Sequence, residues 1–388
     1  MTGDVVSINS IWFWAVVAAA VFAMRALSRS RWRPYAFALV NLLFLAILLR
    51  EKVVLVLGGL AVIAAMLALL ARQPTRRIAL WVGGIVLLAL FVFHKAAHGF
   101  TLVASPLTSS VLVAVGFSYV TLRLIEVMRA VNEGAERQPS PVELVNYLLP
   151  FHMLAAGPIQ AYQDFLRQPA VPPPLDQRAV LDGLDRIARG VFKKFVLAYA
   201  IHKLFLTGFT GGFAYSIFEA QMTLLWLYLD FSAYSDIAVG VGRLMGVATP
   251  ENFDRPFRAR NLMEFWDRWH ISLSLWIRRN LFFPIQIALV RRSETPHPLL
   301  FAAIATLIAF TLAGLWHGLD RGWFIWGLLH AIGLIAVRLW GHLLQQRLDR
   351  DTLARYRSSR LVHGIAVFLT FEYVAFAFVP VFVLAASS

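Results

Sequence analysis

Two histidines in the second half of the chain each follow a tryptophan directly, in the pairs Trp269-His270 and Trp316-His317. Both pairs lie in strongly apolar surroundings. An ionisable side chain in or beside hydrocarbon is costly, so its presence there is a functional hypothesis by default. Imidazole is also the side chain whose ordinary pKa suits proton abstraction near neutral pH. We therefore predict that His270 and His317 take part in proton transfer.

The motifs of several common enzyme mechanisms are absent from the sequence. It contains no G-x-S-x-G elbow, no H-E-x-x-H zinc helix and no P-loop lysine. The sequence therefore lacks the residues that serine hydrolases, zinc peptidases and nucleotide-driven enzymes need. The chain has no cysteine and cannot itself supply a thiolate nucleophile or a thiolate metal ligand. A histidine base still suffices for acyl transfer from a thioester, because a thiolate leaves readily without a strong general acid. We predict one-base acyl transfer without a metal.

A second group of polar residues follows the apolar run at 213–229. Asp230 and Tyr234 are four residues apart, hence on one face of a helix, and such side chains cannot face lipid. They either contact the substrate or form a buried hydrogen-bond network that fixes helix packing, and the sequence leaves both possibilities open. The other candidates for substrate contact lie in the polar blocks around the two histidines and are Asn252, Arg268, Trp269 and Trp316.

The composition places these residues in a membrane protein. Hydrophobic residues make up 59% of the 388, charged residues only 15%, and the mean hydropathy is +0.67, which leaves too little polar surface to cover a soluble globule. The formal net charge is +14. Most of this excess lies in short loops beside apolar runs, as the positive-inside bias requires. We therefore predict contacts with membrane lipids and no nucleic-acid partner.

The first half of the chain has the pattern of a series of membrane helices. Apolar runs at 11–24, 35–49, 53–71, 78–93 and 109–128 each approach the ~20 residues that span hydrocarbon as a helix. Arginines gather after the first and third runs, which places those loops in the cytoplasm and the N-terminus outside. The apolar but short segment 143–156 predicts a re-entrant or tilted helix. The basic, amphipathic segment 176–194 is predicted to lie along the membrane interface.

The second half continues with apolar stretches that alternate with polar ones. We expect helices at 195–206, 213–229, 299–316, 322–339 and 361–386, and a helical but densely polar segment at 261–290. Five arginines in the linker 345–360 place it inside. Both termini are then extracytoplasmic, and the total is roughly eleven crossings. The predicted fold class is an all-α polytopic membrane protein with additional re-entrant and interfacial helices.

Several blocks of sequence together resemble the membrane-bound O-acyltransferase (MBOAT) family. The most specific block is EFWDRWHISLS at 264–274, and the others are AAGPI at 155–159, residues 228–246, PENFDRPF at 250–257, GLWHG at 314–318 and WGLLH at 326–330. The likeness is closest to the bacterial branch that contains the alginate O-acetyltransferase and teichoic-acid D-alanyl transferase membrane subunits. It extends from residue 116 to the end of the chain. The first four predicted spans resemble the family only in being apolar and not in particular residues.

The resemblance implies roles for individual residues. The family's catalytic histidine falls on His317, which would be the base, and its second active-site histidine falls on His270, which would assist it. His330 lies in the following helix and would be supportive at most. The implied fold is a ring of tilted helices around a central funnel, in one domain over 1–388 with peripheral spans at 1–100 and a catalytic core at 109–388. Residues 278–280 (RRN) depart from the Arg-Asp pair common in the family.

The resemblance also implies a reaction. We expect transfer of an acetyl group from a thioester, either acetyl-CoA or an acyl carrier protein, at the cytoplasmic face, with no tightly bound cofactor. The acceptor would be a hydroxyl of a cell-envelope or exported polysaccharide met outside, directly or through a partner acyltransferase. The alternatives are D-alanyl transfer from a carrier-protein thioester to a teichoic-acid-like polymer, an ion-coupled transporter and a non-catalytic scaffold. The expected location is the cytoplasmic (inner) membrane.

Overall fold

The computed structural model shows an all-helical chain. The residues that it describes are 8, 10–70, 82–86, 88–89, 91–92, 116–133, 139–154, 156–206, 213–295 and 297–385. Over these residues the structure has no β-sheet, and its one strand-like feature is an isolated antiparallel bridge between Phe253 and Trp269. The all-α fold class predicted from the sequence is confirmed for the described residues.

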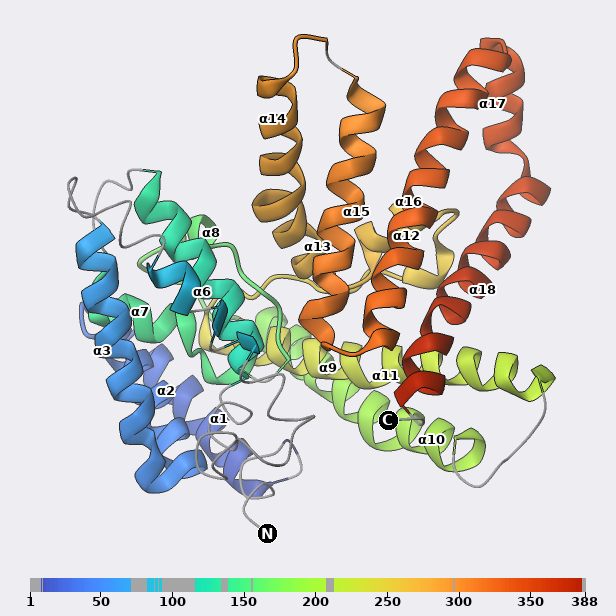
Figure 1. Cartoon of the computed structure of the whole chain (residues 1–388). Helices are drawn as coiled ribbons and strands as arrows, with labels where there is room; N and C mark the ends of the chain where they lie inside the picture. The colour runs from blue at the N-terminus through green and yellow to red at the C-terminus, as the bar shows by residue number, and fades with distance from the viewer. Residues whose placement is uncertain are drawn as a thin grey trace. The chain divides into compact units, whose positions relative to one another are not determined.

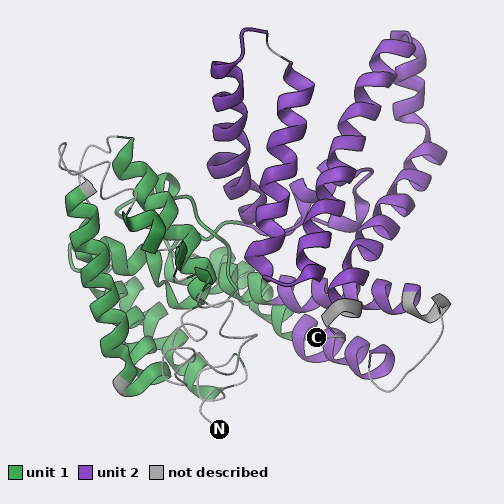
Figure 2. Cartoon of the chain, viewed as in Figure 1, with its two compact units in different colours: residues 1–191, 234–250 green, residues 192–233, 251–388 purple. Residues whose placement is uncertain are grey.

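The chain forms two compact units (Figure 2). Unit 1 contains Met1–Val191 and Tyr234–Pro250, and unit 2 contains Phe192–Ala233 and Glu251–Ser388. Helix α11 (Phe213–Met245) contributes its first part to unit 2 and its second part to unit 1. All three histidines singled out above therefore belong to unit 2.

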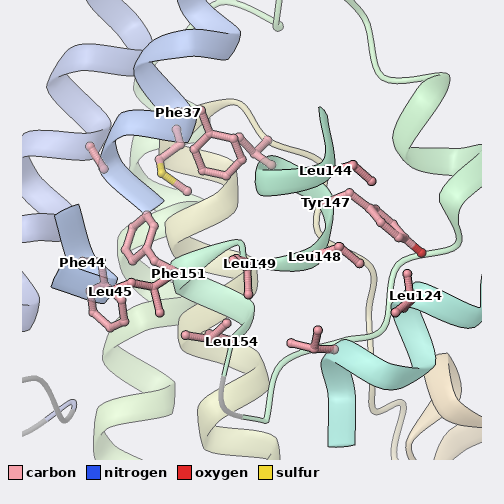
Figure 3. Packing of buried hydrophobic residues seen from close by; sticks show 14 of the residues in the cluster. Phe37, Phe44, Leu45, Leu124, Leu144, Tyr147, Leu148, Leu149, Phe151 and Leu154 are labelled. Atoms are coloured by element: carbon pink, nitrogen blue, oxygen red, sulfur yellow. The ribbon is translucent and has the colours of Figure 1, made fainter. Parts of the chain in front are cut away.

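Unit 1 consists of short and medium helices around an apolar core. Its helices are α1 (Ile11–Ala26), α2 (Arg33–Leu49), η1 (Arg50–Lys52), α3 (Val53–Leu70), α6 (Phe117–Asn132), α7 (Pro141–Leu148), η2 (Phe151–Met153), α8 (Tyr162–Leu166) and most of α9 (Gln177–Phe192). Aromatic and leucine side chains of α2, α6, α7 and η2 fill the core (Figure 3). The rings of Phe44 and Phe151, whose centroids are 5.6 Å apart, pack against each other in this core. The helices predicted at 11–24, 35–49 and 53–71 are confirmed.

The segment predicted to be re-entrant at 143–156 is a broken helix. α7 ends at Leu148, and after Pro150 the chain makes only one 3-10 turn, because proline lacks an N–H and disfavours helix at the residue before it. The free carbonyls of Leu148 and Met153 accept hydrogen bonds from the guanidinium of Arg123 at 3.1 and 2.8 Å. Arg123 of α6 is fully buried. Because a buried backbone carbonyl without a partner is costly, Arg123 stabilises the break.

Unit 2 contains the longest apolar helices. Its elements are η3 (Lys193–Ala198), α10 (Tyr199–Phe205), the first part of α11, η4 (Pro256–Arg258), α12 (Leu262–Arg268), α13 (Ile271–Ile277), η5 (Arg278–Phe282), α14 (Phe283–Arg292), α15 (Pro298–His317), α16 (Arg321–Arg347), α17 (Arg350–Ser358) and α18 (Arg360–Ala385). Helix α16 packs against both α15 and α18, and α17 joins the end of α16 to the start of α18 (Figure 1).

Four helices of the described chain are long and apolar enough to cross a membrane by length and composition. They lie at Ile217–Met245, Pro298–His317, Arg321–Arg347 and Arg360–Val381, and shorter apolar helices lie at Ile11–Ala26, Arg33–Leu49 and Val53–Leu69. These helices are those of a polytopic membrane protein. The total of about eleven crossings and their arrangement as a ring stay predictions.

Several boundaries differ from those that the sequence predicts. The segments 176–194 and 195–206 form one continuous helical stretch through α9, η3 and α10, with a π-helical middle. The run at 213–229 continues to Met245 as α11, because Asp230 and Asp236 have basic partners that let polar residues remain in the helix. The linker 345–360 contains α17. Residues 78–81, 87, 90 and 93 of the predicted run 78–93, and 109–115 of the run 109–128, lie outside the described residues, and the described residues of 78–93 are helical.

Candidate active site

The polar segment 261–290, predicted to be helical, breaks at Trp269-His270. Helix α12 ends at Arg268, Trp269 is extended with φ −106° and ψ 128°, and His270 takes the left-handed conformation with φ 44° and ψ 51° before α13 begins. This conformation costs an L-residue with a side chain about 1–2 kcal/mol, and strain of this kind gathers at functional sites. The expectation of unbroken helix was wrong at these two residues.

The chain just before α12 holds this break in place. Besides the bridge between residues 253 and 269, the N–H of Asp254 donates to the carbonyl of Arg268 at 2.9 Å, and the N–H of Ile271 donates to the carbonyl of Asn252 at 3.0 Å. These bonds replace the helical ones that the break gives up. Hydrophobic periodicity indicates only the local preference for helix or strand. It therefore cannot predict that this segment pairs with a separate part of the chain.

The side chain of Asn252 sets the tautomer of His270. Asn252 Oδ1 accepts from the Ser272 N–H at 3.2 Å and from the Ser272 hydroxyl at 2.8 Å, so this amide atom is the oxygen. His270 Nδ1 lies 3.0 Å from the same atom. Because an amide oxygen only accepts, Nδ1 carries the proton of His270, and Nε2 is the atom with the lone pair. Asn252 is therefore a positioning residue for His270.

We expect Asn252→Ala to slow acyl transfer by up to roughly 10²-fold, because misplacing a catalytic group by about 1 Å can have an effect of this size. Ser272→Ala is the matched control, since it removes a donor to the same oxygen but leaves the His270 contact in place. The control should lose less activity than Asn252→Ala. Transfer rates and melting temperatures of both variants measure the difference, and equal losses would contradict the positioning role.

His270 itself is buried, with 2% of its surface exposed, and Phe231 meets its ring edge-on at a centroid distance of 4.7 Å. Burial lowers the pKa of His270 well below its usual value, and a positive charge on His317 lowers this pKa further. His270 is thus neutral near pH 7, and it belongs to the same unit as His317.

His317 is the last residue of α15 and lies among three indole rings. Trp323 stacks on it with 4.7 Å between centroids, and Trp316 and Trp326 meet it edge-on at 4.7 and 5.4 Å. Unlike His270, it is partly exposed. The ring is therefore held in place by its aromatic neighbours and is partly accessible.

Close packing of α15 on α16 brings His317 to these tryptophans. A Cβ at Gly314 would meet the carbonyl oxygen of Trp323 and would lie 3.1 Å from the Cα of Gly327. A Cβ at Gly327 would in turn lie 2.5 Å from the carbonyl oxygen of Phe310. Small residues at facing positions let membrane helices approach closely. The two glycines thus set the distance between the helix that carries His317 and the helix that carries its ring partners.

Gly314→Ala should lower both the melting temperature and the transfer rate. The new Cβ must push α15 from α16, and overpacking of this kind typically costs about 1–3 kcal/mol. Gly341→Ala on α16 is the matched control, because no described atom lies within 4 Å of a Cβ there, and it should leave the rate unchanged and the melting temperature equal or higher. Thermal unfolding in detergent and a transfer assay compare the two. Similar losses in both variants would count against the close-packing role.

His330 lies on α16 and is fully buried. Trp266 of α12 donates from Nε1 to Nδ1 of His330 at 3.3 Å, and the ring of Trp326 lies 4.5 Å away between centroids. An indole nitrogen only donates, so Nδ1 of His330 accepts and its Nε2 carries the proton. His330 and His270 are therefore held in opposite tautomers.

Asp230 and Tyr234 are not brought to the histidines by any described contact. Asp230 forms an ion pair with Lys194 at 2.5 Å within unit 2, which supports the packing-network alternative for this carboxylate. Tyr234 belongs to unit 1 and packs against the apolar core there. Substrate contacts of both residues stay predictions.

The candidates next to the two histidines have structural partners. Arg268 pairs with Glu264 at 3.0 Å, and Trp269 stacks on Phe265 with 5.4 Å between centroids; these contacts stabilise α12 and the break that follows it. Trp316 contacts His317 directly. Their predicted contacts with substrate are untested by this geometry. The sequence analysis did not assign roles to Trp266, Trp323 and Phe231, and the one available signal was their position within or close to the motif blocks.

An apolar cavity of about 330 Å³ lies beside Trp266 in unit 2. Trp266 and Phe310 form part of its wall, and the rings of both also face His330, at 5.2 and 6.4 Å between centroids. Arg338 and the ion pair between Arg278 and Asp267 also line it. This volume and lining suit a small organic group with a polar end. Within the parts of the chain that are described, no three His, Asp or Glu side chains gather as metal ligands.

Comparison with known proteins finds similarity to acyltransferases. The family model described as MBOAT, membrane-bound O-acyltransferase family, matches residues 78–379, a range that includes all three histidines. A teichoic acid D-alanyltransferase of Bacillus subtilis is 28% identical over 273 residues, which cover 68% of this chain and 67% of that protein. A peptidoglycan O-acetyltransferase of Helicobacter pylori is 34% identical over 198 residues, or 50% of this chain and 36% of the relative. A probable alginate O-acetylase of Pseudomonas aeruginosa is 31% identical over 243 residues, or 60% and 44%.

Proposed function

Because the chain belongs to the membrane-bound O-acyltransferase family, and is thus an O-acyltransferase, we propose that it moves an acetyl group from a cytoplasmic thioester to hydroxyls of a cell-envelope or exported polysaccharide. The observation that carries this proposal is that His317, a partly exposed imidazole at the end of α15, lies in the same unit as a buried, neutral His270. Similarity to a peptidoglycan O-acetyltransferase and to a probable alginate O-acetylase supports an acetyl group and a polysaccharide acceptor.

In the proposed reaction His317 accepts the proton of the acceptor hydroxyl while the hydroxyl oxygen attacks the carbonyl carbon of the thioester. A C–O bond forms, the C–S bond breaks, and the thiolate leaves with the electrons of that bond. The imidazolium then returns its proton to the thiolate, so the base is regenerated. His270 has its lone pair on Nε2 and assists as an acceptor that orients the hydroxyl or the ring of His317. The donor would be acetyl-CoA or an acyl carrier protein, with no tightly bound cofactor.

D-alanyl transfer to a teichoic-acid-like polymer is the second candidate. The chain covers 67% of the D-alanyltransferase relative but only 36% and 44% of the two acetylating relatives, so in extent it matches the D-alanyl enzyme better. Its identity to the acetylating relatives is higher. Both reactions pass an acyl group from a thioester to a hydroxyl, and the same base serves either. Membership of an enzyme family favours both over a transporter or a scaffold.

The test is made on the polymers of the cell. A strain with the gene deleted is complemented with the wild-type chain or with His317→Ala, and the esters on purified envelope and exported polysaccharides are measured by mass spectrometry. Acetyl esters should disappear on deletion and return only with the wild-type chain. Loss of D-alanyl esters instead would select the second candidate, and an unchanged set of esters would refute both.

We further propose that the protein lies in the cytoplasmic membrane with both termini outside. The support is the clustering of arginines after the first helix and in the linker 345–360. Reporter enzymes that are active only outside the cytoplasm should work when fused to either terminus and fail when inserted within α17. Activity of the α17 insertion, or inactivity of both terminal fusions in well-expressed proteins, would overturn this topology.

A further inference from the structure

Two buried hydrogen-bond donors near His317 have no acceptor in the described part of the chain. They are the indole Nε1–H of Trp326 and the Nε2–H of His330, in residues that are 3% and 0% exposed. A buried polar group without a partner costs about 1–3 kcal/mol, and such groups are rare enough in native proteins to need a reason. Two of them next to a candidate base therefore point to a ligand atom that accepts from both.

The two donors lie on one side of α16. Trp326 and His330 are four residues apart, so their side chains share a helix face. The ring of Trp326 contacts both histidines, with centroids 5.4 Å from His317 and 4.5 Å from His330. The hydrogen bond from Trp266 to Nδ1 leaves Nε2 of His330 as its only donor. The helix thus presents two neutral N–H groups beside the ring that takes the proton.

The surroundings of the two donors are apolar. The rings of Trp266 and Phe310 flank His330 at 5.2 and 6.4 Å, and Phe378 lies 5.9 Å from Trp326, all between centroids. In such apolar surroundings a hydrogen bond from these donors is electrostatically stronger than one in water. Neutral N–H donors fixed in such a place suit an oxygen that gains negative charge only during the reaction.

We propose that Trp326 and His330 donate hydrogen bonds to the carbonyl oxygen of the transferred acyl group and stabilise the negative charge that develops there. This inference rests on the proposed acyl transfer. As the acceptor oxygen adds to the carbonyl carbon and its proton passes to His317, the C=O electron pair moves onto the carbonyl oxygen, which the two N–H groups hold. The pair returns as the C–S bond breaks, the thiolate departs and the ester forms, so both donors end the cycle unchanged.

Trp326→Phe tests the first donor because it keeps an aromatic ring and removes only the indole N–H. Full-length protein is expressed in the deletion strain, and the initial rate at which labelled acetate or labelled D-alanine enters ester linkage on envelope polymer is measured. We expect a loss of about 10²-fold, the size found when one oxyanion donor is removed. Trp340→Phe is the matched control, since it removes an indole N–H from an exposed position of the same helix. The control should transfer at the wild-type rate.

Two variants of His330 test the second donor. His330→Leu removes every polar atom of the ring, whereas His330→Gln keeps an acceptor for the indole of Trp266 and an N–H that can reach the acyl oxygen. We expect His330→Leu to be nearly inactive and His330→Gln to recover part of the rate. Equal rates for the two would argue that the donor plays no part.

Melting temperatures separate the proposed role from a structural one. Because Trp326→Phe removes a donor that has no described partner, the purified variant should melt at the wild-type temperature or above it. A lower melting temperature would show a structural partner for the indole and overturn the inference, as would wild-type transfer by Trp326→Phe. If the wild-type chain itself incorporates neither label, the proposed function is wrong, and this inference, which depends on it, is wrong as well. An active wild type beside a fully active Trp326→Phe overturns the inference alone.

Discussion

His317→Ala is expected to abolish ester transfer while the protein stays folded. A positioned general base contributes roughly 10²- to 10⁴-fold to a rate, and in the proposed reaction His317 is the group that removes the acceptor proton. The packing around it comes mainly from Trp316, Trp323 and Trp326, which the substitution leaves in place. The measurement is the rate of ester formation on the native polymer, together with the melting temperature of the detergent-solubilised protein.

A second variant separates the base from a merely structural histidine. His317→Gln keeps hydrogen-bonding capacity at nearly the same volume but cannot accept a proton near neutral pH, so it should be as inactive as the alanine variant and melt with the wild type. If His317 instead served only packing, its loss would lower stability by about 1–3 kcal/mol, and the glutamine variant would retain transfer. Retained transfer, or inactivity explained wholly by unfolding, would contradict the assignment of His317 as the base.

His270→Ala should weaken transfer by roughly 10²-fold, the scale of a misplaced catalytic group, and less completely than His317→Ala. A residue that orients or polarises can be replaced in part by water, whereas a base cannot. The fixed tautomer of His270, with Asn252 accepting from Nδ1 at 3.0 Å, is what gives its Nε2 a defined role. Transfer rates of His270→Ala and His317→Ala, measured at matched expression, show which substitution causes the larger loss.

The backbone at His270 supplies the control. Its φ of 44° strains alanine but not glycine, so His270→Gly should be more stable than His270→Ala and yet equally slow if the imidazole matters. If the glycine variant is both more stable and faster in transfer than the alanine variant, only the backbone bend at residue 270 is needed and the imidazole is not. Wild-type activity in either variant would remove His270 from the site.

The class of protein and the pair of histidines were predictable from the sequence. Apolar runs long enough to span hydrocarbon follow from composition alone, and α15, α16 and α18 lie close to the predicted ranges. The block around His270 and the one around His317 identified a family because several residue types recur there in fixed spacing. The two histidines lie in one unit of the structure, and the family match confirms the resemblance.

The break in the helix at His270 was not predictable in the same way. Residues 261–290 have local helix preference throughout, and the pairing of 252–254 with the chain around Trp269 overrides it. The break after α7 likewise depends on Arg123 of another helix. Helix propensity is a weak local term that tertiary contacts routinely override, so both breaks needed the fold.

What the sequence by itself determined about this protein is its solvent and its enzyme class: a bilayer, because apolar residues dominate, and an O-acyltransferase, because the motif blocks identify the family. The tertiary structure decided the surroundings of the motif histidines. It placed His317 against indoles of α16 through the Gly314 and Gly327 contact, and it fixed opposite tautomers on His270 and His330. The physical reason is that a proton's position on an imidazole depends on which atom lies opposite each nitrogen. Those neighbours come from distant parts of the chain.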